Sequence, residues 1–177
     1  MRLLINGIEK LTRWAGWLGA ALTVSLIFAM VYEVLARYLF NAPTFWAYEL
    51  AYMMMGTGLM LGIAYTMQAG SHVRVDLFYH SRSPRFRTLI DLIGCLVMLP
   101  MILWMCMGLW DYFLRAYVTG EGSGESAWNP IVWPFRLFFV IGFVLFALQI
   151  VAEILKSILL LSGAEEFDTN PNEKGRL

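Results

Sequence analysis

The sequence predicts an all-α, polytopic membrane protein with four transmembrane helices. Of its 177 residues, 59% are hydrophobic and 15% are charged, and the mean hydropathy is +0.63. A soluble domain carries about 25% charged residues. Most of the apolar residues fall in four stretches, at Trp14–Ala36, Leu50–Met67, Leu92–Trp110 and Leu137–Ala152. A bilayer core of about 30 Å needs about 20 mostly apolar helical residues, so each stretch is long enough, or nearly so, to cross a membrane.

Turn signals set the ends of these helices, which are predicted over about residues 12–40, 47–68, 84–117 and 130–161. Asn41-Ala42-Pro43 separates the first helix from the second. Ser83-Pro84 is typical of an N-cap followed by proline at the first helical position. Gly120–Gly124 predicts a flexible outer loop, and the polar residues 163–177 predict a flexible cytoplasmic tail. The whole chain, 1–177, is expected to form a single integral membrane domain.

The distribution of basic residues predicts the orientation. With four crossings, the N-terminus, the second loop and the tail lie on one side and carry ten lysines and arginines, against three on the opposite side. Basic residues are retained on the cytoplasmic side of membrane proteins. Both termini are therefore expected in the cytoplasm.

Two ion pairs are predicted near the outer membrane face. Glu33 and Arg37 are four residues apart on the first helix, and Asp111 and Arg115 repeat this spacing on the third. Charges inside a bilayer are costly, so each pair has to be explained. Three explanations stay open: mutual neutralisation at the interface, docking to another subunit, or a direct role in ion transport. Glu153 is expected to pair with Lys156 near the inner end of the fourth helix.

The second helix carries a carboxylate and a small-residue motif. Glu49 lies in its first turn, where a negative charge interacts favourably with the helix dipole. Gly58 and Gly62 are four residues apart, a spacing that allows another helix to approach closely, either within this chain or from a partner. Pro100 lies midway along the third helix and predicts a kink there.

Other classes of chemistry are not supported. The two histidines, His72 and His80, fall in the second loop, whereas membrane haem needs axial ligands inside the helices. Cys95 and Cys106 are eleven residues apart on one helix, too far for a disulfide, and are interpreted as packing residues. No metal-ligand spacing or nucleophile motif is present. The sequence therefore predicts neither an enzyme nor a cofactor.

Several short motifs follow one another along the chain. They are Arg37–Pro43 with Trp46 and Glu49-Leu50, then Gly70–Asp76, then Glu125-Ser126, Pro130, Trp133-Pro134, Gly142-Phe143 and Gln149. Together, over about residues 5–160, they resemble the small membrane subunit of the tripartite ATP-independent periplasmic (TRAP) transporters. There is one departure, because many members carry two adjacent acids after the tryptophan, where this chain has Tyr48-Glu49.

The resemblance implies a small accessory or scaffold subunit in the bacterial inner membrane. It would pair with a large membrane subunit of about a dozen helices, for sodium-driven uptake of an organic acid delivered by a periplasmic binding protein. We expect Glu33, Arg37, Trp46, Glu49, Gly58 and Gly62 to contribute to the subunit interface. No cofactor is expected, and a formal net charge of zero leaves no basic surface for a nucleic-acid partner.

Two alternatives remain at this point. The chain could be an independent four-helix exporter that works as a homodimer, with Glu33 as the coupling carboxylate. It could also be a membrane enzyme or a redox anchor, which the lack of histidines within the helices disfavours. A titratable Glu33 with transport by the purified chain would favour the exporter, and bound haem or quinone would favour the anchor.

Overall fold

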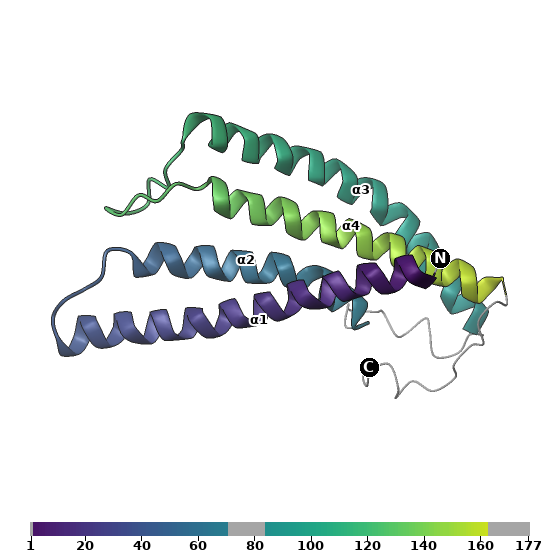
Figure 1. Cartoon of the computed structure of the whole chain (residues 1–177), viewed down its shortest axis with the longest axis horizontal. Coiled ribbons are helices and arrows are strands. Elements are labelled where there is room, and N and C mark those ends of the chain that lie inside the picture. Colours follow the sequence, from purple (N-terminus) through teal and green to yellow (C-terminus); the bar gives the residue numbers. More distant parts are fainter. Residues whose placement is uncertain (1, 71–83, 163–177) are drawn as a thin grey trace.

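The computed structural model describes residues 2–70 and 84–162, and within these ranges the chain is all-helical with four long helices (Figure 1). They are α1 (Arg2–Leu39), α2 (Ala47–Gln68), α3 (Pro84–Thr119) and α4 (Trp133–Leu161). Each is long and apolar enough to cross a membrane. The predicted tail, the histidines and most of the Gly70–Asp76 motif lie outside the described residues.

α1 starts ten residues before the expected position. The prediction was based on the apolar stretch, whereas the preceding turns are amphipathic and pack against the chain. Ile5 is buried, and Glu9 forms an ion pair with Lys156 of α4. At about 57 Å and 54 Å, α1 and α3 are longer than the bilayer core, so they must tilt or extend beyond it.

α4 holds the described helices together. It contacts α1, α2 and α3, whereas α3 contacts α4 alone among the helices, and α1 runs along α2 (Figure 1). A core cluster joins α2, α3 and α4 through Leu61, Ala64, Cys95, Leu145, Phe146 and Ile150. Cys95 is buried in this cluster and Cys106 is partly buried, which fits the packing role expected from the sequence.

Glycines allow the helices to approach closely at two crossings. A Cβ added to Gly19 of α1 would lie 2.8 Å from the Gly58 carbonyl oxygen of α2. A Cβ added to Gly142 of α4 would lie 2.5 Å from the carbonyl oxygen of Met60, also in α2. Both distances are shorter than real Cβ contacts, so these crossings require glycine.

Successive helices alternate in direction, which places the start of α1 and the end of α4 at the same end of the bundle (Figure 1). The connections at the opposite end are residues 40–46, between α1 and α2, and residues 120–132, between α3 and α4. We refer to this end as the loop end. It carries most of the candidate site.

Candidate functional site

Glu33 and Arg37 form the predicted ion pair at the loop end of α1. The Arg37 Nε donates to Glu33 Oε1 at 2.9 Å, and the Arg37 Nη2 contacts the same oxygen. The Glu33 side chain is only 8% exposed, whereas that of Arg37 is 55% exposed. The buried acid is therefore neutralised by a cation that remains accessible from outside.

The second carboxylate oxygen of Glu33 binds the loop that follows. The backbone N–H of Thr44 donates to Glu33 Oε2 at 2.9 Å, and the Thr44 hydroxyl contacts the same oxygen. Charge-assisted hydrogen bonds of this kind are about twice as strong as neutral ones. Both oxygens of Glu33 are thus engaged, one by Arg37 of α1 and the other by the loop at Thr44. This weighs against the exporter alternative, since that alternative needs a carboxylate free to exchange protons.

The loop turns sharply at Asn41, whose φ is 51°. This left-handed conformation ends many helices, and asparagine tolerates it better than most residues. The Ala42 N–H donates to the Ala36 carbonyl at 3.0 Å and so completes the helix cap. Beyond the turn, the Trp46 ring stacks on Tyr32 of α1, with centroids 6.0 Å apart. The structure therefore brings Glu33, Arg37 and Trp46 together.

Glu49 is arranged differently. It lies in the first turn of α2, as expected, but its side chain is completely buried, and neither carboxylate oxygen has a hydrogen-bond partner among the described residues. Tyr52, one turn further along α2, packs edge-on against Phe135 of α4, with centroids 5.7 Å apart. In this structure Glu49 has no surface with which to touch another protein.

The two glycines of the small-residue motif lie in different environments. Gly58 packs against the backbone of Gly19 at the crossing of α1 and α2, so its small size is used within the chain. A Cβ added to Gly62 would meet nothing within 4 Å. Of the six predicted interface residues, Arg37, Trp46 and Gly62 are accessible, whereas Glu33, Glu49 and Gly58 are occupied inside the subunit.

A second ion pair at the loop end was missed from the sequence. Arg136, in the first turn of α4, is nearly buried and donates two hydrogen bonds to Glu121, at 2.7 and 2.8 Å. Its guanidinium also lies over the Tyr112 ring of α3, 3.7 Å from the centroid. These hydrogen bonds hold the pKa of the Glu121 carboxyl below its ordinary value. An arginine within an apolar helix needs an anion, and this requirement was the available signal.

The segment expected to be a flexible outer loop is a hydrogen-bonded hairpin. The Ser123 N–H donates to the Pro130 carbonyl and the Val132 N–H to the Glu121 carbonyl, both at 3.0 Å. Positive φ angles at Gly120 and Gly124 allow the sharp turns. Together with the Arg136 pair, these bonds fix the hairpin to the ends of α3 and α4.

A third polar cluster joins α1 and α4 at the opposite end of the bundle. Lys156 forms the predicted pair with Glu153, at 2.9 Å, and a further pair with Glu9 of α1. Gln149, completely buried one turn from Glu153, donates to it at 3.0 Å. The cluster explains why the first turns of α1 remain helical and docked.

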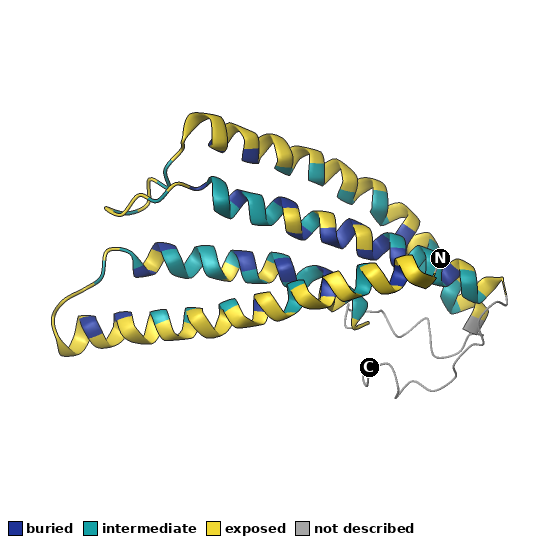
Figure 2. Cartoon of the chain, viewed as in Figure 1, coloured by how far each residue is buried: buried dark blue, intermediate teal, exposed yellow. Residues whose placement is uncertain are grey.

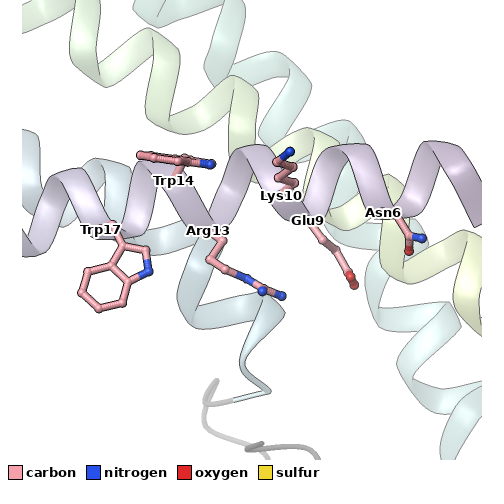
Figure 3. A pocket seen from close by; sticks show the side chains of 6 residues that line it. All are labelled: Asn6, Glu9, Lys10, Arg13, Trp14 and Trp17. Carbon is pink, nitrogen blue, oxygen red and sulfur yellow. The ribbon is translucent and has the colours of Figure 1, made fainter. Parts of the chain in front are cut away.

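A pocket of about 750 Å³ lies beside the first turns of α1 (Figure 3). The described side chains that line it all come from this helix: Asn6, Glu9, Lys10, Arg13, Trp14 and Trp17. Basic residues and tryptophans together are typical of a membrane–water interface. The lining of the pocket therefore has the composition expected at the edge of a bilayer.

The described residues contain no group of three or more histidine, cysteine, aspartate or glutamate side chains arranged to hold a metal ion. Ionised groups in three clusters, around Glu33, Arg136 and Lys156, hold helices and loops of the same chain. Four apolar helices joined in this way define a multi-pass membrane protein.

Sequence comparison identifies the family. The profile described as "Tripartite ATP-independent periplasmic transporters, DctQ component" matches residues 26–160. The chain belongs to this family, and is therefore a small permease subunit of a TRAP transporter and a multi-pass protein of the inner membrane.

Two curated relatives agree with this assignment. One is the C4-dicarboxylate TRAP transporter small permease protein DctQ of Vibrio cholerae, 27% identical over 96 residues, which are 54% of this chain and 39% of the relative. The other is the sialic acid TRAP transporter permease protein SiaT of Haemophilus influenzae, 24% identical over 109 residues, 62% of this chain but 16% of the relative. The matches thus span well under half of either relative. No solved structure matches the chain significantly.

Proposed function

We propose that this subunit is a static accessory scaffold. It pairs with a large membrane subunit for sodium-driven uptake of an organic acid delivered by a periplasmic binding protein. The observation that carries the proposal is that both carboxylate oxygens of Glu33 already have hydrogen-bond partners. A buried membrane carboxylate that binds Arg37 and Thr44 serves structure rather than ion movement. The names of the two relatives refer to sialic acid and C4-dicarboxylates, which are both organic acids.

The comparison with SiaT supports a large partner. The segment similar to this chain makes up 16% of that permease, so the relative carries the same module within a much longer polypeptide. A separate small subunit would then need to associate with the remaining membrane part by non-covalent contacts. The low burial of α1 and α3 leaves broad apolar faces for lipid and for such contacts.

The loop end supplies the proposed outer contact. With both termini in the cytoplasm, as the basic residues favour, residues 40–46 face the periplasm. There Arg37 offers an exposed guanidinium beside the partly exposed Trp46, and arginine and tryptophan are both enriched where protein interfaces bind most tightly. We propose that these two side chains contact the large subunit or the docked binding protein, and that Gly62 is a further candidate on α2.

Transport by reconstituted vesicles tests the function. Vesicles containing both membrane subunits, together with the binding protein, should accumulate the organic acid only under an inward sodium gradient. Vesicles that lack the small subunit should be inactive. Equal uptake without the small subunit would refute the scaffold role, and transport by the small subunit alone that is abolished by Glu33→Gln would support the exporter instead.

The outer contact is tested separately with Arg37→Gln and Trp46→Ala. Both should lower uptake by about tenfold. Because Arg37 also neutralises the buried Glu33 and Trp46 stacks on Tyr32, the melting temperature of each isolated variant is measured as well, and uptake is compared per folded subunit. Ser25→Ala, on an exposed face of α1 away from the loop, is the matched control. Wild-type uptake by both variants would refute the contact.

A further inference from the structure

The outward face of α3 differs from an ordinary lipid-facing surface. α3 has the smallest buried share of the four described helices, and Figure 2 shows it exposed along most of its length. At 100° per residue, one exposed stripe runs along the side opposite α4. We call it the α3 stripe, and its residues are Val97, Met101, Trp104, Gly108, Asp111 and Arg115.

Pro100 adjoins this stripe and is itself exposed. Proline has no backbone N–H, so the carbonyl of Leu96 loses the donor that an uninterrupted helix supplies. Leu96 is exposed as well. A free carbonyl facing hydrocarbon is unfavourable, and in membrane helices neighbouring helices commonly provide the missing donor. The α3 stripe therefore borders a polar acceptor near mid-helix.

Trp104 lies close to the midpoint of α3 and is 74% exposed. Tryptophan favours the headgroup region, as for Trp110 and Trp133 at the loop end, whereas Trp104 lies about 9 Å deeper than Trp110. One turn along, a Cβ added to Gly108 would meet nothing within 4 Å. A second helix can approach closely at this glycine and pack against the exposed tryptophan ring.

Asp111 and Arg115 complete the stripe. They were expected to pair with each other, but among the described residues no ion pair joins them, and both side chains are exposed. Two opposite charges one turn apart are thus available to a partner. They lie beyond the apolar part of the stripe, toward the loop end, where a partner helix would also leave the membrane.

The exposed face of α1 provides the contrast. The middle of one exposed stripe of this helix, with the same helical spacing, consists of Ala20, Val24, Ile27 and Val31, and Trp17 continues the stripe toward the helix start. The four mid-helix side chains are aliphatic and exposed, and the glycines of the adjoining turns, Gly16 and Gly19, face α2 instead. At mid-helix the α1 stripe has the composition that lipid alone requires. The α3 stripe there combines an exposed tryptophan, an open glycine and a carbonyl without its helical donor, and it ends in two charges that form no ion pair among the described residues.

We propose that the α3 stripe is the surface on which a transmembrane helix of the large subunit packs. That helix crosses α3 closely at Gly108 and places a hydroxyl or amide donor near the Leu96 carbonyl. This inference rests on the proposed function and specifies where the two subunits meet inside the bilayer.

Photo-crosslinking in membranes that contain the whole transporter tests the inference. Benzoylphenylalanine is placed at Met101 or Trp104 of α3 and, as the matched control, at Val24 or Ile27 of α1. Adducts with the large subunit from the α3 positions alone are expected. If the two subunits co-purify but adducts arise only from α1, or the α3 positions label only lipid or a second copy, the inference is overturned while the proposed function stands. If no large subunit co-purifies, the proposed function itself fails.

Substitutions measure the same contact independently. Gly108→Leu should reduce co-purification of the large subunit by about tenfold, because a leucine side chain separates the two helix backbones. Ala20→Leu on the α1 stripe should leave it unchanged, and the melting temperature of each isolated subunit confirms that it folds. Loss of pairing with Gly62→Leu but not with Gly108→Leu would place the contact on α2 and overturn the inference.

Discussion

The substitution Gly142→Ala tests the packing of α4 on α2. The added Cβ would lie 2.5 Å from the Met60 carbonyl oxygen, whereas ordinary contacts begin at 3.4 Å, so the two backbones must separate by about 0.9 Å. Overpacking of this kind costs about 1–3 kcal/mol. Alanine also raises helix propensity by about 1 kcal/mol, which would hide part of the loss.

Gly62→Ala is the control that removes this ambiguity. It makes the same chemical change within a membrane helix, but the new Cβ meets nothing within 4 Å. The propensity gain cancels in the comparison, so the difference between the two variants is the overpacking cost itself. Thermal unfolding in detergent, followed by tryptophan fluorescence, should place Gly142→Ala about 2–12 °C below Gly62→Ala. Equal melting temperatures would refute the close crossing.

Three further outcomes are expected. Glu33→Gln removes the anion that binds Arg37 and Thr44, so the Thr44 amide should lose protection from hydrogen exchange, while the melting of the helices changes little. Glu121 has a lowered pKa, so its stabilisation of the hairpin is complete above the ordinary value of 4.5 and is lost as the pH falls through the lowered value. Protection of the Val132 amide from hydrogen exchange should fall over the same pH range, and Arg136→Gln should abolish this pH dependence. Lys156→Met leaves two carboxylates facing each other and should destabilise the isolated subunit by about 1–3 kcal/mol in denaturant unfolding.

The parts of the fold that follow from local physics could be predicted. A run of about 20 apolar residues forms a helix in a membrane because every backbone group must be bonded internally. The pair between Glu33 and Arg37 depends only on residues one turn apart, and the same holds for Glu153 and Lys156. These contacts require no knowledge of how the helices pack.

Contacts between distant segments could not be predicted in the same way. Glu9 is helical and paired because α4 brings Lys156 beside it, and no local signal shows which helices are neighbours. The motif of Gly58 and Gly62 identifies a helix able to pack closely, but not which of the two glycines faces α1. Asp111 and Arg115 have the same spacing as Glu33 and Arg37, yet no ion pair joins them among the described residues, so spacing makes such a pair possible without ensuring it.

The central claim, that this chain is the small membrane subunit of a larger transporter, is tested most directly by isolating the tagged chain from its native membranes in mild detergent. Mass spectrometry then identifies what is retained. We predict one large polytopic membrane protein in equal amount, with weaker or no recovery of the binding protein. Recovery of the chain only as a homo-oligomer would contradict the account.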